Sequence, residues 1–175
     1  MKILALDLSF TNTGWALGAP GQTPINDSLH FAKRGSRNAD HFAGFHHWLT
    51  LHLAEHDPDI VAIEGPLAPS FMRGHTTTDT ARALMGLIAV AELATHEFGD
   101  VREHAVSTIR QFFLGTSKIK SRDAKQMTFD RCVQLGWKPK DKDAADALAL
   151  WAYQVSLISP AEGIKLLPLF WRASA

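Results

Sequence analysis

The sequence ILALDL at residues 3–8 is an apolar run that carries one acidic residue, Asp7. A second apolar run, IVAIE at residues 60–64, ends in Glu64. Short, almost uninterrupted apolar runs are typical of strands that are buried on both faces of a sheet. Burying an unpaired polar group costs roughly 2–7 kcal/mol, and burying a charge costs more. Each of the two carboxylates therefore needs a partner that offsets this cost.

A third acidic motif follows much later in the chain, DAADALAL at residues 143–150. Asp143 and Asp146 are three positions apart, so in a helix they share one face. A hard divalent cation such as Mg²⁺ takes oxygen ligands and can offset the charge of several carboxylates gathered from distant segments. We therefore predict that Asp7, Glu64, Asp143 and Asp146 form one metal site.

Each acidic residue also has a simpler explanation. Asp7 precedes a turn rich in Ser, Thr and Asn that it could begin, and Glu64 could be a solvated strand end. Asp143 could be the N-cap of its helix, and Asp146 could be placed there by the helix dipole. None of these explanations accounts for the set of four.

The sequence resembles the RuvC-type branch of the RNase H-like nucleases, specifically the compact forms carried by phages and prophages. The matching segments are LALD at 4–7, TGW at 13–15, AIE at 62–64, IRQFFLG at 109–115 and DAADALA at 143–149. The resemblance implies a Mg²⁺-dependent endonuclease, usually dimeric, that cuts branched DNA such as four-way (Holliday) junctions. We expect two Mg²⁺ ions per site, replaceable by Mn²⁺, and a nick with a 5′ phosphate and a 3′ hydroxyl.

Alternating patterns of strands and helices predict the architecture. We expect strands at 3–9, 14–18, 28–33, 59–64 and 101–106, and helices at 40–56, 79–98, 121–135 and 142–158. Short turns favour antiparallel pairing of the first three strands, and intervening helices favour parallel pairing of the first, fourth and fifth. This is an α/β fold of the RNase H-like kind: a five-stranded mixed sheet flanked by helices on both faces, forming a single domain over residues 1–175.

The chain carries 18 basic and 18 acidic residues, but they are unevenly distributed. Residues 110–142 hold nine basic and three acidic residues, whereas residues 1–109 hold seven basic and twelve acidic ones. A local basic excess supplies phosphate contacts to DNA even when the net charge is zero, although charged stretches are often only solvated helix faces. The DNA-binding candidates in this segment are Arg110, Lys118, Lys120, Arg122 and Lys125; the resemblance places Arg110 and Lys120 where RuvC-type enzymes carry phosphate-contacting lysines.

The loop after Glu64 contains Phe71 and Arg73 as further candidates for DNA contact. RuvC-type enzymes often use an aromatic residue of this loop as a wedge at the branch point, and apolar wedges bend DNA in other proteins. Phe71 could instead fold back onto the core.

Three other functions are compatible with parts of this pattern. An actin-like or sugar-kinase-like ATPase also follows its first strand with an acid and a Ser/Thr/Gly turn, but 175 residues leave no room for its second domain. A nuclease for forks and flaps, or a catalytically silent DNA-binding scaffold, would share the fold.

The spacing of His52 and His56 can bind a metal, but zinc sites normally recruit three or four ligands, so we expect these to be surface histidines of the helix at 40–56.

Partners and location follow from the same reading. Two cuts in one junction require two active sites, hence a two-fold homodimer, and the small and apolar residues of the helix at 79–98 could form its interface or the monomer core. No apolar run approaches the roughly 20 residues of a membrane span, so we expect a cytoplasmic protein with no membrane contact.

Overall fold

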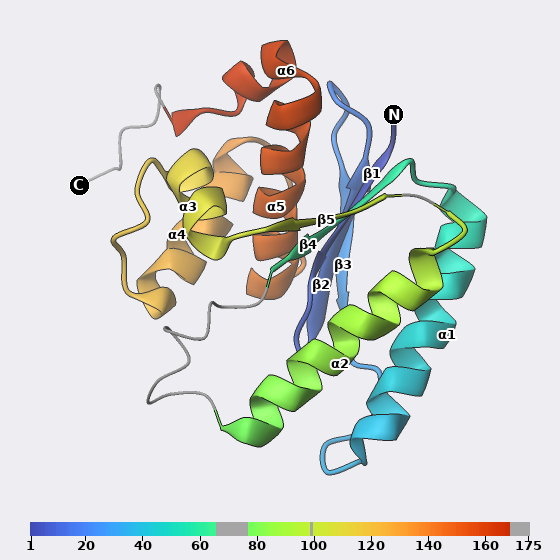
Figure 1. Cartoon of the computed structure of the whole chain (residues 1–175). Helices are drawn as coiled ribbons and strands as arrows, with labels where there is room; N and C mark the ends of the chain where they lie inside the picture. The colour runs from blue at the N-terminus through green and yellow to red at the C-terminus, as the bar shows by residue number, and fades with distance from the viewer. Residues whose placement is uncertain (66–76, 99, 169–175) are drawn as a thin grey trace.

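The computed structural model describes residues 1–65, 77–98 and 100–168. Its centre is a five-stranded sheet in the order β3-β2-β1-β4-β5 (Figure 1). The strands are β1 (Ile3–Asp7), β2 (Thr13–Gly18), β3 (Ile25–Leu29), β4 (Ile60–Glu64) and β5 (Asp100–His104). β1 pairs antiparallel with β2 and parallel with β4, β2 pairs antiparallel with β3, and β4 pairs parallel with β5. The predicted mixed sheet is confirmed.

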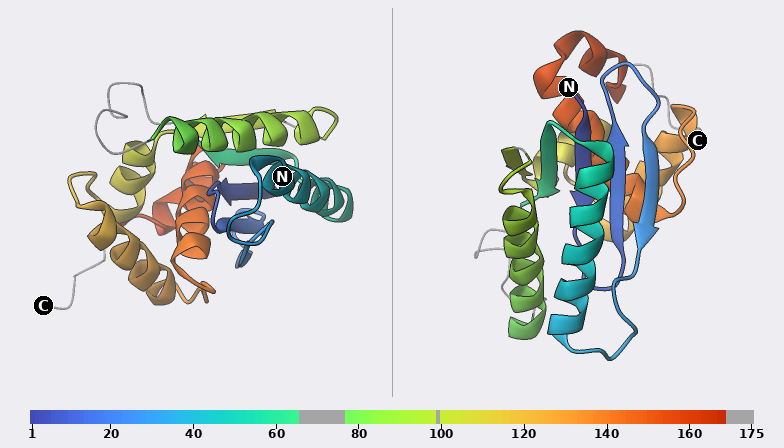
Figure 2. Two further views of the ribbon diagram at one scale, coloured as in Figure 1. Left: turned by 90° about the horizontal axis from the view of Figure 1, so that it is seen from below. Right: turned by 90° about the vertical axis from the view of Figure 1, so that its right-hand side faces the viewer.

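Helices cover both faces of the sheet, as two perpendicular views make clear (Figure 2). One face carries α1 (Asn38–His56) and α2 (Thr78–Thr95). The other carries α3 (Val106–Leu114), α4 (Ser121–Gln134), α5 (Lys142–Ile158) and, at its end, α6 (Pro160–Lys165). Among the residues that the structure describes, no helix is long and apolar enough to cross a membrane.

Side chains of β1 alternate between two hydrophobic cores, which explains why the strand is apolar throughout. Ile3 and Ala5 pack in the core with α3, α4 and α5, whereas Leu4 and Leu6 pack in the core with α1 and α2. All four side chains are fully buried. A central strand of this kind can end in a carboxylate only where the helices leave the sheet edge open to a ligand or a counter-charge.

α5 lies closest to the sheet because its inner face is built from alanines, among them Ala144, Ala145, Ala147 and Ala152, all fully buried. The approach is tightest at Gly14 of β2, where a Cβ atom would lie 2.0 Å from the carbonyl oxygen of Asp143. Only glycine fits that position. The small residues therefore bring the first turn of α5 directly onto the strands that carry the acids.

Several predicted boundaries were wrong. The third strand is 25–29 instead of 28–33; as a sheet edge with one buried residue, Ser28, it has a weak apolar period. β1 ends at Asp7 instead of residue 9, which moves this acid from within a strand to its end. The short helices α3 and α6 were not predicted, because segments of 9 and 6 residues show too little periodicity to be recognised.

Candidate active site

Asp7 and Glu64 are the last residues of two neighbouring parallel strands. The register pairs Leu6 with Ile63, so the two acids follow side by side at the same edge of the sheet. Carboxyl ends of parallel strands are where sheets of this type place ligands. The pairing of β1 with β4 thus places the two acids on adjacent strand ends.

Asp143 and Asp146 lie in the first two turns of α5 and face the end of β1. One carboxylate oxygen each from Asp7, Asp143 and Asp146 can be chosen so that all three lie within 4.8 Å of one another. Carboxylate oxygens at this separation fit a hard divalent cation. Glu64 is not part of this triplet; it lines the adjoining cavity.

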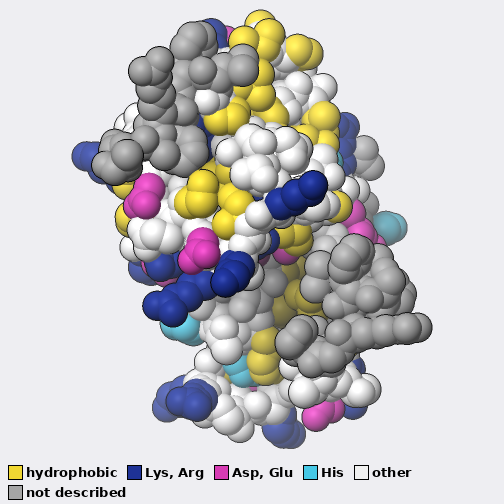
Figure 3. Space-filling view, turned by 90° about the vertical axis from the view of Figure 1, so that its left-hand side faces the viewer, with side chains coloured by type: hydrophobic (Ala, Val, Ile, Leu, Met, Phe, Trp, Pro, Cys, Tyr) yellow, Lys and Arg dark blue, Asp and Glu magenta, His cyan; other side chains and the backbone are white. Residues whose placement is uncertain are grey.

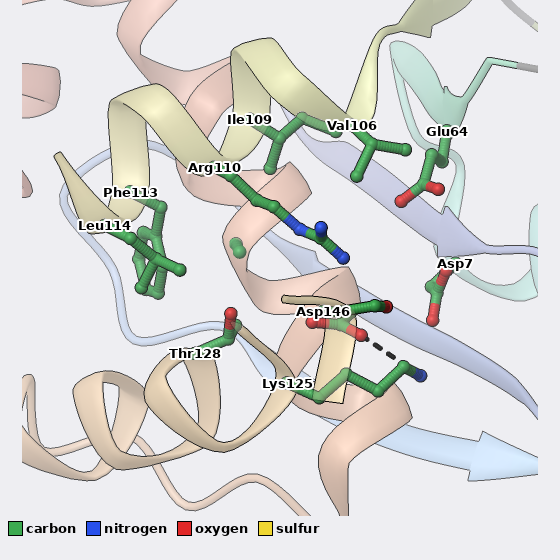
Figure 4. A pocket seen from close by; sticks show the side chains of 12 residues that line it. Asp7, Glu64, Val106, Ile109, Arg110, Phe113, Leu114, Lys125, Thr128 and Asp146 are labelled. Carbon is green, nitrogen blue, oxygen red and sulfur yellow. Dashed lines mark ion pairs between the residues drawn. The ribbon is translucent and has the colours of Figure 1, made fainter. Parts of the chain in front are cut away.

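The cavity beside the triplet has a volume of about 150 Å³ and is lined by Asp7, Glu64 and Asp146 together with two cationic side chains, Arg110 and Lys125. Figure 4 shows Arg110 and Lys125 extending from α3 and α4 toward the acids. Val106, Ile109 and Phe113 of α3 form an apolar wall. The site is thus a small hollow in which acids and cations face each other.

Lys125 forms ion pairs with two of the acids. Its Nζ lies 2.6 Å from Asp143 Oδ1 and 3.2 Å from Asp146 Oδ2. Burial alone would lower the pKa of Lys125, but the hydrogen bond to Asp143 and the charges of Asp146 and Asp7 raise it well above its ordinary value. Lys125 therefore stays charged and offsets part of the negative charge of the cluster.

Burial and mutual repulsion perturb the acids themselves. Burial, followed by the charges of Glu64 and Asp146, raises the pKa of Asp7 well above its ordinary value. Burial and the charge of Asp146 raise the pKa of Glu64 to about 7, against the opposing effect of Arg110 and Lys125. The pKa of Asp146 is also raised, chiefly by burial. Carboxylates gathered at this cost gain most from a multivalent cation, so the donor set fits a metal.

A hydrogen-bond network that the sequence did not reveal fixes Asp143. The Asn12 side chain donates to Asp143 Oδ2 at 2.8 Å and to Asp141 Oδ2 at 3.2 Å. Asp141, not Asp143, is the N-cap of α5, and its Oδ1 accepts from the amides of Asp143 and Ala144. Burial alone would raise the pKa of Asp141, but these amides, Ser28 and Asn12 lower it. The only sequence signal was an Asp two residues before the motif, which is a common N-cap position.

The remaining DNA-binding candidates fall into three groups. Arg110 and Lys125 lie in the cavity, as described. Lys118, Lys120 and Arg122 are exposed on the α3–α4 connection and the start of α4, and they form no ion pair with a described residue. On the face that carries α3 and α4, lysine and arginine side chains gather beside a hollow lined by apolar groups (Figure 3). Phe71 and Arg73 lie outside the described residues.

The histidines of α1 do not all face solvent, so the prediction of surface histidines was wrong in part. His41 and His52 are buried. His52 stacks on Trp48 with ring centroids 4.8 Å apart and meets His56 edge-on at 4.3 Å. Burial, with a further effect of His56, lowers the pKa of His52 to about 4. These rings are part of an aromatic core layer under the sheet.

The fold and the acidic cluster define a class: metal-dependent nucleases with an RNase H-like sheet, in which acids from the first strand, a parallel neighbour and a late helix meet. Comparisons with known proteins place the chain within that class. The family model of crossover junction endodeoxyribonuclease RuvC matches residues 32–153. The RuvC endonuclease of Mycobacterium sp. (strain KMS) is 29% identical, covering 86% of this chain and 80% of that protein.

Solved structures agree on the fold. Thermus thermophilus RuvC superimposes with a TM-score of 0.64 at 17% identity, covering 86% of this chain and 90% of that one. The fowlpox virus Holliday junction resolvase gives 0.60 at 12% identity, covering 90% and 99%. The chain belongs to the RuvC family of crossover junction endodeoxyribonucleases.

The raised pKa of Glu64 predicts a pH-dependent stability of the metal-free protein. A carboxyl group whose pKa is about 4.3 when unfolded and about 7 when folded stabilises the fold below its unfolded pKa, and this contribution is lost as the pH rises through 7. The depressed pKa of His52 acts in the opposite direction, chiefly below about pH 6.5 and by only a few tenths of a kcal/mol (roughly 0.4) above it. Urea unfolding in EDTA should therefore show lower stability at pH 8 than at pH 6.5, by on the order of 1 kcal/mol. The Glu64→Gln variant, which cannot titrate there, should lose most of this difference; an equal pH dependence in both proteins would contradict the assignment.

The Asn12–Asp141 network predicts two separable effects. Asp141→Ala should remove the helix cap, costing about 1 kcal/mol of stability, and should weaken Mg²⁺ binding by roughly 10- to 100-fold, as changes behind metal ligands do. Asn12→Ala should weaken Mg²⁺ binding without the loss of the cap. Isothermal titration calorimetry with Mg²⁺ and urea unfolding measure the two effects, and Asp123→Ala, an exposed acid in the first turn of α4, is the control. Wild-type Mg²⁺ affinity in both variants would show that the network does not orient Asp143.

Proposed function

We propose that this chain resolves Holliday junctions by Mg²⁺-dependent hydrolysis, with Asp7, Glu64, Asp143 and Asp146 as the catalytic acids. The observation that carries the proposal is the convergence of acids from β1, β4 and α5 at one sheet edge, in a chain that belongs to the RuvC family. Thermus thermophilus RuvC, similar in fold, has been solved in complex with a Holliday junction. We also propose that the protein is cytoplasmic, that residues 1–175 form a single domain, and that the chain is of the compact phage or prophage form.

The geometry suggests how the side chains divide the work. Asp7, Asp143 and Asp146 would hold one Mg²⁺, and Asp7 with Glu64 on the far side of the cavity would hold a second; Mn²⁺ fits the same oxygen donors. The bound ions supply an activated water and charge stabilisation for the leaving oxygen. Asp7 belongs to the triplet and also lines the cavity with Glu64, so it would contribute to both positions.

The two cations of the cavity, Arg110 and Lys125, would also contact the DNA. A bound metal ion would offset the charge of Asp143 and Asp146 in place of Lys125, so that Lys125 could contact a phosphate. Arg110, which lines the same cavity, could contact a phosphate as well. In this reaction water would add to phosphorus as it gives up a proton to solvent, the bond to the 3′ oxygen would break, and that oxygen would take up a proton, which leaves a 5′ phosphate and a 3′ hydroxyl. The exposed Lys118, Lys120 and Arg122 would extend the phosphate-binding surface along the DNA arm.

The competing ATPase assignment finds no support at the turn after β1. The Thr13 hydroxyl donates to the carbonyl of Ser9 at 3.0 Å, and the Ser9 amide donates back to that hydroxyl at 3.3 Å. These groups hold the turn itself and are not presented to a nucleotide phosphate. A broader preference for forks or flaps remains the second candidate, since a single active site of this kind cuts any accessible branched strand. Cleavage of matched four-way, forked, flapped and linear DNAs in Mg²⁺ distinguishes the two.

The acids predict a loss of catalysis without a loss of binding. Asp7→Asn and Asp146→Asn each remove a metal ligand but no phosphate contact. Loss of a residue that only supports a metal ligand lowers activity by up to about a hundredfold, so loss of a ligand itself should lower cleavage of a four-way junction by more than that. Binding measured by fluorescence anisotropy should be kept or improved, because negative charge near the DNA falls. Asp130→Asn, on the exposed face of α4, is the matched control. Near wild-type cleavage by Asp7→Asn would refute the metal site.

Dimerisation is proposed from the outer face of α2. Ala83, Leu87 and Ala91 of this helix are buried in the core, whereas Met85 is 49% and Leu93 is 69% exposed. Met85, Ala89 and Leu93 recur every four residues and so form one apolar stripe on the outside of the helix. Because Met85 is not core, the stripe is available to a second copy.

Met85→Glu should therefore leave the monomer folded but weaken the dimer. Light scattering should show a shift from twice the 19.3 kDa chain mass toward one, circular dichroism should be unchanged, and paired cuts in a supercoiled cruciform plasmid should become single nicks. Leu51→Glu, an equally exposed apolar position on α1, is the control. A Met85→Glu protein that still dimerises and still makes paired cuts would exclude this interface.

A further inference from the structure

A second, larger cavity lies on the other side of the β1–β2 turn from the acids. Its volume is about 990 Å³, and its walls come from the β1–β2 turn, the connection between β3 and α1, and the first turns of α1. The residues that carry its chemistry are Phe10, His30, Phe31, Lys33, Arg34 and His41. None of its lining residues is acidic.

The apolar wall of this cavity consists of two phenylalanines held rigidly from behind. Phe10 stacks on the buried His41 with ring centroids 4.0 Å apart and meets Phe42 at 6.4 Å. Phe31 packs against Phe45 at 5.2 Å and Trp48 at 5.5 Å. Both phenylalanines remain partly exposed. Each ring therefore packs on other aromatic rings and still lines the cavity.

The opposite wall is cationic. Lys33 and Arg34 are exposed and form no ion pair with a described residue, whereas the neighbouring Arg37 is paired with Asp40 at 3.0 Å. A tight turn presents the two free cations: Gly35 has a φ of +88°, and the Ser36 amide donates to the Lys33 carbonyl at 3.0 Å. Figure 3 shows basic side chains at the lower end of the face, at the level of the β3–α1 connection in Figure 1.

The cavity is close to the acids along the chain. Phe10 follows Asp7 by three residues, so their Cα atoms are at most about 11 Å apart. Asn12, two residues further, donates to the metal-site residue Asp143. Along one DNA strand, 11 Å is about three base steps. A strand whose phosphodiester lies at the acids can therefore reach the cavity with a nucleotide only a few positions away.

We propose that this cavity binds an unpaired nucleotide of the DNA strand held at the active site, with its base against Phe10 and Phe31 and its phosphates near Lys33 and Arg34. Sites for single-stranded nucleic acid combine these two elements, a cationic groove and aromatic stacking surfaces. The proposal rests on the proposed function, because it assumes that branched DNA occupies the acidic site. It adds a preference for junctions whose exchange point carries unpaired bases.

The test uses two fluorescein-labelled four-way junctions that differ only in two unpaired thymidines beside the exchange point. Binding is measured by anisotropy in the Asp146→Asn background, so that no strand is cut. The parent should bind the junction with unpaired bases more tightly. Phe10→Leu, which keeps apolar packing but removes the flat ring, should weaken that complex roughly five- to 150-fold, the range for one base–aromatic stack, and should leave the fully paired junction nearly unaffected.

The cations are tested through salt dependence. Lys33→Ala and Arg34→Ala should each reduce the slope of log affinity against log salt by about 0.7–0.9, the value for one phosphate contact. Lys165→Ala, an exposed lysine on α6, should leave the slope unchanged. Thermal unfolding by circular dichroism confirms that each variant is folded, and the two basic variants keep the test valid if Phe10→Leu does not fold.

The outcomes are distinct. If the parent shows no preference for unpaired bases, or if the preference survives Phe10→Leu, the nucleotide site is overturned. If Lys33→Ala and Arg34→Ala reduce the salt slope while Phe10→Leu leaves the preference unchanged, the cations contact only duplex backbone, and the nucleotide site is again overturned. Junction cleavage by the chain without the Asp146→Asn change is measured in parallel. If that protein cuts no branched DNA, the proposed function fails; if it cuts and the cavity variants bind like their parent, only the cavity assignment fails.

Discussion

Burial of several carboxylates at one edge of the sheet is the constraint that shapes this site. Burial raises the pKa of Asp7, Glu64 and Asp146, and the charge of Asp146 raises the pKa of Asp7 and Glu64 further. A fold dominated by burial alone would not keep such a cluster, because each buried charge costs free energy. The cluster is tolerated because the surrounding helices contribute two cations, and because a bound divalent metal ion would offset the free energy of burying the carboxylates.

The close approach of α5 to the sheet determines where the acids meet. Gly14 allows contact with the backbone of Asp143, and the buried alanines let the helix axis lie near the strands. Asp141 then fixes the start of the helix, because its carboxylate accepts hydrogen bonds from two backbone amides of α5 and from the side chains of Asn12 and Ser28. A bulkier residue at position 14 would push the first turn of α5 away from β1 and separate two of the metal-binding oxygens from the third.

Charge is segregated around the acidic edge in a way that suits a polyanionic strand. On one side, α3 and α4 present Arg110, Lys125 and a run of exposed basic residues; on the other, the β3–α1 connection presents Lys33 and Arg34. The acids between them would repel DNA on their own. The flanking cations offset the charge of the acids and so allow a phosphate to approach them. The local distribution of charge therefore explains how a chain with a net charge of zero can act on nucleic acid.

Long apolar periods and a distinctive acidic motif are local signals, so the sequence alone predicts β1, β2, β4, β5, the long helices and the acids Asp7, Asp143 and Asp146 that the structure brings together. It misplaces β3, misses the short helices α3 and α6, whose periodicity is too brief, and does not reveal the true cap of α5. Only the tertiary structure decided that Lys125 pairs with Asp143 and Asp146, that Asn12 orients Asp143, and that Phe10 and Phe31 share a cavity with Lys33 and Arg34. Each of these contacts joins elements that are brought together by packing on the sheet, and packing between distant segments leaves no period or motif in the sequence from which it could be read.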